Sequence, residues 1–156
     1  MIKIVCVGKI KEKELSVLIL DYVKRIQPYH KLEIVELKDL PSGEDPFINQ
    51  KVIESESESI LRQIQSEDDV ILLELKGKGL DSLSLANRIQ QSFNQSSKNL
   101  IFVIGGSLGV NEEVRIRANT LWKLSENTFP HGIVRLLCVE QIYRSFRILN
   151  NHPYHK

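Results

Sequence analysis

The sequence predicts an α/β fold in which helices cover both faces of a parallel β-sheet. Segments with strand character alternate with segments of helical period along the chain, which is the pattern of such folds. The strand segments are mostly continuous apolar runs, as expected for strands that are buried on both sides. No repeat and no linker long enough to separate two folding units interrupts this order, so we expect residues 1–156 to form a single domain.

Five short segments are expected to be the strands, because each is an apolar run bounded by turn-forming or charged residues. They are Ile2–Val7, Leu32–Leu37, Val70–Leu75, Leu100–Ile104 and Leu121–Leu124. The first run stops at Gly8, and the third is expected to be closed by Gly77 and Gly79. The second run contains glutamates and is the most polar of the five.

Five further segments are expected to be helices, from their apolar periodicity and from their start and stop signals. They are Lys11–Ile26, Phe47–Gln65, Leu83–Phe93, Glu112–Thr120 and Gly132–Leu149. The first helical pattern stops before Pro28, which cannot continue a helix. Asp81 and Ser82 precede the third as possible caps. Pro130 suits the first turn of the last helix.

The composition excludes several classes of protein. Cys6 and Cys138 both lie in apolar runs, which favours buried thiols in a reducing compartment over a disulfide. No Cys/His cluster has the spacing of a zinc site. No apolar stretch reaches the roughly 18 residues of a membrane span, and the first residues lack the pattern of a signal peptide. We therefore expect a soluble, cytoplasmic protein with no metal and no membrane partner.

The charge is nearly balanced but unevenly distributed. The net charge of +1 excludes a large, generic field for nucleic acid. Residues 1–31 hold seven Lys/Arg and three Asp/Glu, whereas residues 33–81 hold five and thirteen. Residues 131–156 hold four and one, with three histidines. If the two basic ends meet in the fold they form a local basic face; ordinary scatter of charge is the alternative.

Two strands run into glycines, at residues 101–109 and 72–79. In open α/β sheets, ligands bind beyond the carboxyl ends of the strands, and glycine lets a ligand approach the backbone closely. Neither segment matches the dinucleotide fingerprint or a P-loop. Each alone is equally consistent with a tight turn. Two such junctions in one parallel sheet are expected to line one crevice.

The segment at residues 124–131 is a third candidate for ligand binding. It is polar, and Phe129 is pushed towards an extended conformation because Pro130 follows it. The backbone groups of such a loop are free to hydrogen-bond a small polar ligand. A plain connection between strand and helix is the alternative.

The last helix and the residues after it carry the remaining candidates. Glu140, Arg144 and Arg147 share one helix face, either as a surface ion pair or as a phosphate-facing arginine held by the glutamate. The tail at residues 152–156 holds two imidazoles, a phenol and an ammonium, groups that could stack on or deprotonate a base. His30 is interpreted as a surface residue and Trp122 as part of the core.

Six short motifs occur in order along the chain and together resemble a known family. They are Val7-Gly-Lys9, Leu73-Glu-Leu-x-Gly-Lys78, Phe102-Val-Ile-Gly-Gly-Ser107, Phe129-Pro-His131, Arg135…Glu140-Gln-x-Tyr-Arg144 and Pro153-Tyr-His-Lys156. In this register the chain resembles the ribosomal RNA large subunit methyltransferase H family, within the SPOUT class of knotted methyltransferases. The resemblance covers essentially the whole chain.

The resemblance implies a specific fold and activity. The family uses S-adenosylmethionine to methylate N3 of a pseudouridine in helix 69 of 23S rRNA, on the assembled ribosome. Its parallel sheet has a C-terminal part threaded as a trefoil knot. It works as a homodimer with the last helix at the interface. The cofactor-binding residues implied for this chain are Leu73, Gly105, Leu124, Ser125, Glu126, Asn127, Thr128 and Phe129.

The roles of the other site residues are hypotheses from residue type and position. We expect Tyr154 and His155 to stack on the base or remove its proton, with Glu140 as the orienting group and Arg144 as a further catalytic residue. Arg135, Arg144 and Lys156 are expected to contact RNA. Loss of the imide proton to water is the alternative to a dedicated base. The alternative function is a non-catalytic, ribosome-associated binding module. A doubly wound nucleotide enzyme is disfavoured, because its fingerprint is missing.

Overall fold

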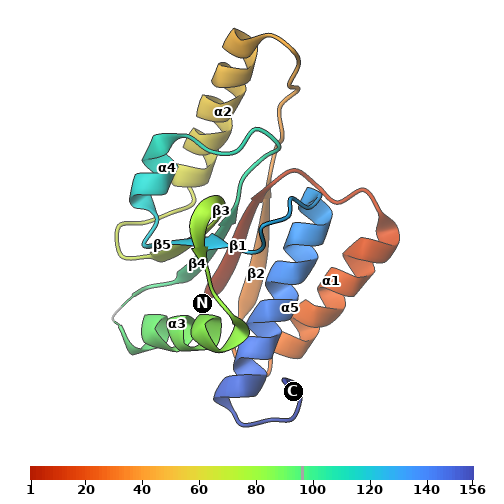
Figure 1. Cartoon of the computed structure of the whole chain (residues 1–156), viewed down its shortest axis with the longest axis vertical. Helices are drawn as coiled ribbons and strands as arrows, with labels where there is room; N and C mark the ends of the chain where they lie inside the picture. The colour runs from red at the N-terminus through yellow and green to blue at the C-terminus, as the bar shows by residue number, and fades with distance from the viewer. Residues whose placement is uncertain (96) are drawn as a thin grey trace.

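The computed structural model describes residues 1–95 and 97–156 and has helices on both sides of one five-stranded sheet (Figure 1). The strands are β1 (Ile2–Val7), β2 (Leu32–Leu37), β3 (Asp69–Gly79), β4 (Leu100–Ile104) and β5 (Thr120–Lys123). They are ordered β2-β1-β4-β3-β5, and each neighbouring pair is parallel. The predicted parallel α/β class is confirmed.

The helices form two layers. They are α1 (Lys13–Ile26), α2 (Pro46–Leu61), α3 (Ser82–Asn94), α4 (Glu112–Arg117) and α5 (His131–Leu149). The helices α1, α3 and α5 share one core with one face of the sheet, and α2 and α4 share a second core with the other face. Among the described residues, no helix is long and apolar enough to cross a membrane.

The two cores follow from the alternation of side chains along each strand. Ile2, Ile4 and Cys6 of β1 face α1 and α5, whereas Val5 and Val7 face the opposite layer. This is why the strand runs are apolar throughout, as the sequence predicted. Both cysteines are buried and free. Trp122 is 1% exposed, so its place in the core is also confirmed.

The third strand differs from the prediction. Instead of ending at Leu75, β3 continues to Gly79, with a shift of register between Leu73 and Lys78. Lys78 and Gly79 pair with the end of β5. A Cβ at Gly77 would lie 2.5 Å from the carbonyl oxygen of Leu121, so glycine lets the bulged chain return against its neighbour. The glycines therefore continue the strand rather than close it.

Two predicted helices were too long at their C-terminal ends. α2 ends at Leu61 rather than Gln65, where the Asp68 carboxylate accepts the Gln65 N–H at 2.9 Å and forms a turn. α4 ends at Arg117 rather than Thr120, because Asn119 already exchanges hydrogen bonds of 2.8 Å with the backbone of Val70. β5 consequently begins and ends one residue earlier than predicted.

The N-terminal ends of three helices and the position of His30 can also be compared with the predictions. α1 begins at Lys13 rather than Lys11, and α5 begins at His131, one residue before the predicted start. Asp81 caps α3 as predicted, accepting the Ser84 N–H at 2.7 Å. His30, interpreted as a surface residue, is only partly exposed, and its ring stacks on Phe93 with centroids 4.7 Å apart.

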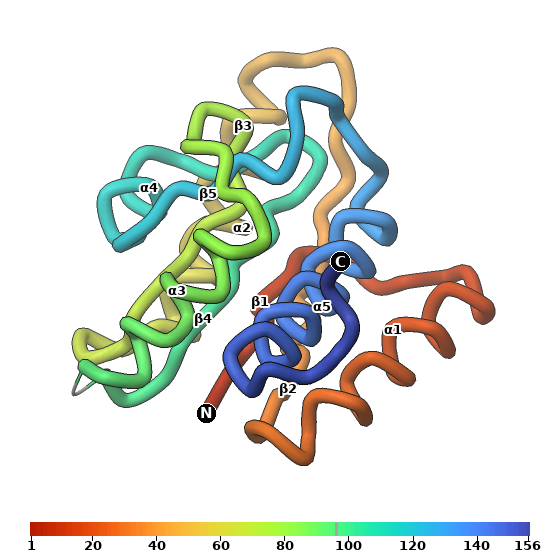
Figure 2. Tube along the Cα trace, turned by 60° about the horizontal axis from the view of Figure 1, so that its bottom comes forward, coloured from red at the N-terminus to blue at the C-terminus, as the bar shows by residue number. Residues whose placement is uncertain are grey.

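The order of strands brings three loops together. β4, β3 and β5 are neighbours and parallel, so the segments that follow them leave the same edge of the sheet. Figure 2 shows the segment after β5 running past the end of β3 before it enters α5. The three candidate ligand-binding segments therefore lie at one edge.

Candidate functional site

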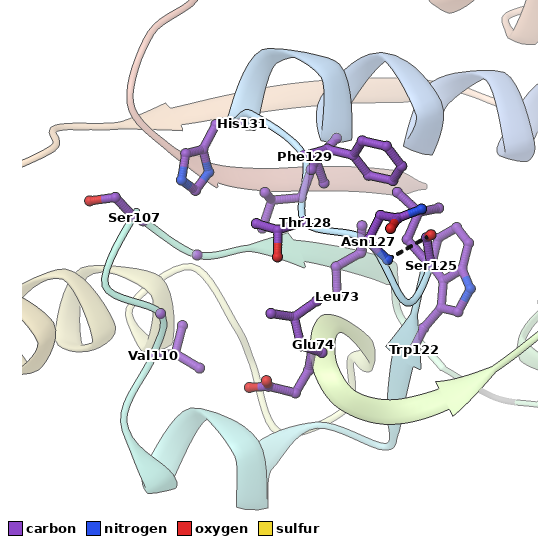
Figure 3. Close-up of a pocket in the computed structure, with 17 residues that line it drawn as sticks. Leu73, Glu74, Ser107, Val110, Trp122, Ser125, Asn127, Thr128, Phe129 and His131 are labelled. Atoms are coloured by element: carbon purple, nitrogen blue, oxygen red, sulfur yellow. Dashed lines mark hydrogen bonds between the residues drawn. The ribbon is translucent and has the colours of Figure 1, made fainter.

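The three loops enclose a cavity of about 220 Å³ at the carboxyl edge of the sheet (Figure 3). Its wall comprises residues 73–75, 104–107, 109, 110, 122, 124, 125, 127–129, 131 and 134. Both strand junctions contribute to it, so the expectation that they line one crevice is confirmed. This is the position at which open parallel sheets bind their ligands.

The first wall is the tight loop that follows β4. A Cβ at Gly105 would lie 2.8 Å from the side chain of Val110, and one at Gly106 would collide with the carboxylate of Glu56. Gly109 has a φ of +82°, and its N–H donates to the Gly106 carbonyl at 3.0 Å. The glycines therefore keep this turn narrow and leave its backbone exposed to the cavity.

The second wall is the bulged part of β3. Leu73, Glu74 and Leu75 line the cavity. Leu73 still pairs with Trp122 of β5, and the register shift that follows takes Glu74 and Leu75 out of the ladder. The Glu74 carboxylate accepts a hydrogen bond from Nε of Arg115 at 2.9 Å, which fixes it against α4. Gly77 and Gly79, which made this junction a candidate, shape the junction but do not line the cavity.

The third wall is the loop between β5 and α5. Its Asn127 N–H donates to the Ser125 hydroxyl at 3.0 Å, as Figure 3 shows. Within the described part of the chain, residues 125–129 make no backbone–backbone hydrogen bond. Apart from the Asn127 N–H, their peptide groups are free to bind a ligand, as expected from the sequence. The side chain of Glu126 is 84% exposed and pairs with Lys123, outside the cavity.

The structure brings together seven of the eight residues predicted to bind a cofactor, all except Glu126. Glu74, Ser107 and His131 line the cavity within the predicted segments but were not singled out as cofactor-binding residues, whereas Val110 and Trp122 lie outside those segments. Glu74 carried a usable signal, since a carboxylate follows an apolar strand directly at the predicted crevice. Among residues 1–95 and 97–156, no three His, Cys, Asp or Glu side chains are grouped to hold a metal ion.

The four predicted catalytic residues form a second cluster, between α5 and the tail. The Tyr154 hydroxyl donates to Glu140 at 3.2 Å and lies 3.3 Å from the hydroxyl of Tyr22. Arg144 pairs with Glu140 at 2.6 Å and lies over the Tyr154 ring at 4.7 Å. Nδ1 of His155 is 3.3 Å from the Arg144 guanidinium. The structure therefore brings these four side chains together, and their catalytic roles stay a prediction.

The environment of this cluster fixes its protonation. Burial raises the pKa of Tyr154 well above its usual range, and the hydrogen bond to Tyr22 and the negative charge of Glu140 act in the same direction. The hydrogen bond to Glu140 raises the pKa of Arg144. At neutral pH, Tyr154 is therefore a hydrogen-bond donor, and Arg144 is a cation.

The tail is docked against the body by Arg147. Its guanidinium donates to the Tyr29 hydroxyl at 2.9 Å and to the Pro153 carbonyl at 3.1 Å. Nδ1 of His152 lies 2.9 Å from the same Tyr29 hydroxyl. These contacts place His155 in the wall of a second hollow of about 500 Å³. The hollow shares wall residues Trp122, Leu124, Ser125 and Phe129 with the first cavity.

Of the three residues expected to contact RNA, two lie at the tail and one is buried. Arg144 is at the tail cluster, and Lys156 is exposed at its end. Arg135, however, is 3% exposed, and its guanidinium pairs with Glu36 at 2.5 Å and donates to the Gly8 carbonyl at 2.9 Å. The prediction that Arg135 offers its charge to RNA was wrong for this structure, because Glu36 of β2 and the carbonyl of Gly8, which follows β1, bind its guanidinium in the interior.

Comparisons with known proteins agree with this geometry. A family model described as "Predicted SPOUT methyltransferase" matches residues 1–155. Proteins named ribosomal RNA large subunit methyltransferase H from Desulforamulus reducens and Carboxydothermus hydrogenoformans are each 43% identical to this chain over 157 residues. These alignments cover 99% of this chain and 98% and 99% of the relatives. The fold and the matched model define a SPOUT methyltransferase. Within that class, the chain belongs to the ribosomal RNA large subunit methyltransferase H family.

Proposed function

We propose that this protein methylates N3 of a pseudouridine in helix 69 of 23S rRNA, using S-adenosylmethionine, on the assembled ribosome. The observation that carries the proposal is the cavity itself. Seven residues assigned to the cofactor by resemblance come from three separate segments and line one cavity. The chain that forms this cavity belongs to a methyltransferase family. The names of the relatives support large-subunit rRNA as the substrate.

The cavity fits the cofactor chemically. Leu73, Trp122 and Phe129 offer apolar surface to a purine ring, and the free peptide groups of residues 125–129 offer hydrogen bonds to its polar edge. Gly105 allows close approach of the ligand to the backbone. The cofactor, when bound, supplies a methyl group activated by a sulfonium. The task left to the protein is to hold the target base in line with that group.

The tail cluster supplies the groups for the RNA side. Arg144, a cation oriented by Glu140, binds a phosphate or a base carbonyl. Tyr154 stays protonated, so it stacks on the base or donates a hydrogen bond rather than accepting the imide proton. His155 is then the side chain proposed to accept that proton, from the wall of the second hollow. The shared wall of the two cavities supports this division of roles.

We further propose that residues 1–156 act as one domain, whose C-terminal part is threaded as a trefoil knot. Strands from both halves of the chain build a single sheet, with β1 between β2 and β4. β5 lies at the sheet edge beside β3, whereas the following α5 packs beside α1 and α3. Residues 124–130 must therefore cross the end of β3, and that crossing supports the threading.

We propose that the active form is a homodimer with α5 at its interface. Ile133 on α5 is 37% exposed, and Leu83 on the neighbouring α3 is 52% exposed. Apolar side chains on this layer support burial against a second copy. The proposed site of action is the cytoplasm, where assembled ribosomes are found.

The proposal is tested first by calorimetric titration with S-adenosylmethionine, with NADH as the control. Micromolar binding of the former alone is expected. Methyl transfer to ribosomes and to a free helix 69 hairpin is then compared, and transfer to ribosomes alone is expected. Absence of cofactor binding even with ribosomes present would instead indicate the non-catalytic module.

The tail is tested by Tyr154→Phe and His155→Ala. Each variant is expected to retain cofactor binding and to lower turnover on ribosomes at least tenfold, because these side chains act on the base. Unchanged turnover in both would remove the tail from the mechanism.

A further inference from the structure

Glu74 is the only carboxylate side chain among the described residues that line the cavity. Apart from it, His131 is the one titratable side chain in that wall, and the rest are apolar, small or neutral polar groups. A cationic ligand would therefore find one negatively charged side chain in the wall of this cavity, partly compensated by Arg115. A ligand without a positive charge would lack the electrostatic part of that attraction.

Arg115 holds the Glu74 carboxylate in place without using all of it. Nε of Arg115 donates to Oε2 of Glu74 at 2.9 Å. The same guanidinium also lies 3.6 Å from Glu112, so one cation is shared between two carboxylates. Oε1 of Glu74 has only a long contact, at 3.4 Å, from the Lys76 N–H. That oxygen keeps acceptor capacity for a further partner.

The carboxylate lies at the α4 side of the cavity, beside apolar side chains. In Figure 3 it lies between Leu73 and Val110, on the side of the cavity that faces α4. The Glu74 side chain is only 13% exposed. Partial exclusion of water strengthens the attraction between a fixed carboxylate and a cation, compared with the same pair in bulk water.

We propose that Glu74 recognises the positive charge of the sulfonium and so distinguishes the methyl donor from the product. This inference rests on the proposed function. When the methyl carbon–sulfur bond breaks and the methyl–N3 bond forms, the sulfonium becomes a neutral thioether, and the imide proton leaves N3. The attraction to Glu74 therefore exists before transfer and is lost after it. Glu74 favours entry of the donor and release of S-adenosylhomocysteine.

The test is a set of calorimetric titrations of the wild type and Glu74→Gln with three ligands. S-adenosylmethionine carries the sulfonium, sinefungin carries an amine in its place, and S-adenosylhomocysteine has no charge there. Glu74→Gln is expected to weaken binding of the first two about tenfold and to change the third less than about twofold. Glu113→Gln, which removes an exposed carboxylate from the same helix as Arg115, is the matched control and leaves all three affinities unchanged.

Two outcomes separate this inference from the proposed function. If the wild type binds none of the three ligands, even with ribosomes present, both fail. If the wild type binds them and Glu74→Gln weakens all three equally or none, the function stands and the role of Glu74 is overturned. Glu74→Asp keeps the charge and is expected to keep the preference for the charged ligands. It provides the comparison if Glu74→Gln fails to fold.

Discussion

At Gly77, the backbone of β5 occupies the space that a side chain on β3 would need. A Cβ there would lie 2.5 Å from the Leu121 carbonyl oxygen and 2.9 Å from the Trp122 nitrogen. Gly77→Ala must therefore push two backbones apart, and we expect it to lower the free energy of unfolding by about 1–3 kcal/mol. Urea denaturation measures this loss.

Gly79 provides the matched control for that substitution. No heavy atom lies within 4 Å of a Cβ built at Gly79, although it belongs to the same strand. Gly79→Ala is expected to change the free energy of unfolding by less than about 0.5 kcal/mol. Equal losses in the two variants would show that the close approach at Gly77 is not what requires glycine.

The buried thiol of Cys6 should make the protein less stable at alkaline pH. Burial raises the pKa of its thiol from 9.0 to about 11, with the charge of Arg135 acting in the opposite direction. Above about pH 9 the unfolded chain releases this proton and the native state retains it, so raising the pH favours unfolding. Between about pH 8 and about pH 10.5, Cys6 should cost about 2 kcal/mol of stability.

The measurement compares urea denaturation of the wild type and Cys6→Ala at both pH values. The variant loses some packing at each pH but lacks the thiol, so its stability should fall less steeply with pH. Identical pH slopes in the two proteins would contradict the role of this thiol. Both cysteines could be placed from the sequence, because an apolar run surrounds each of them.

At the scale of elements, the short helix α4 depends on Asn111, the N-cap residue that precedes it. The Asn111 side chain accepts a hydrogen bond from the Val114 N–H at 3.1 Å. The backbone N–H of Asn111 donates to the Ser57 hydroxyl at 2.9 Å. Asn111→Ala leaves a helix-end N–H without its cap, and we expect a loss of about 1 kcal/mol in unfolding free energy. Thermal or urea denaturation checks the loss.

Asn111→Asp keeps a capping oxygen and should retain most of the stability that Asn111→Ala loses. If both variants are equally destabilised, the contribution of the cap is smaller than its geometry indicates. α4 also carries Arg115, so calorimetric binding of S-adenosylmethionine can be measured on the same two variants.

Element boundaries show what a sequence can and cannot give. Apolar runs identified all five strands, because burial on both faces leaves a strong local signal. The extension of β3 to Gly79 could not be predicted, because it depends on pairing with residues about 45 positions later. The early end of α4 has the same cause, because Asn119 forms hydrogen bonds with the distant Val70 rather than with its neighbours in the sequence.

At the scale of the whole molecule, the proposed dimer can be tested through Ile133 on α5. Ile133→Glu places a charge on the layer proposed to meet a second copy, and we expect the dimer dissociation constant to rise about tenfold or more. Sedimentation equilibrium should give twice 17.9 kDa for the wild type and a lower mean mass for the variant.

Ile116 on α4 provides the control on the opposite layer. It is 76% exposed, more than Ile133, and Ile116→Glu should leave the mass unchanged. A stable dimer in both variants, or a monomeric wild type, would rule out α5 as the interface.

The candidate site was predictable where local sequence carries the signal and not where tertiary contacts decide. The strand–glycine junctions and the loop at residues 124–129 lie together as expected. Arg135 could not be judged from its own helix, because Glu36 and Gly8, roughly a hundred positions earlier, bury its charge. Glu126 is turned away by Lys123, a contact that the loop sequence alone does not reveal.

The position of the cavity residues along the chain determines when the cavity can form during synthesis. Its lining spans Leu73 to Val134, and the tail cluster lies further along, so these parts emerge late from a translating ribosome. The cavity needs β3, β4 and the segment after β5, so it cannot be complete until residues 124–134 have been synthesised. It is therefore one of the last parts of the fold to form while the chain is made.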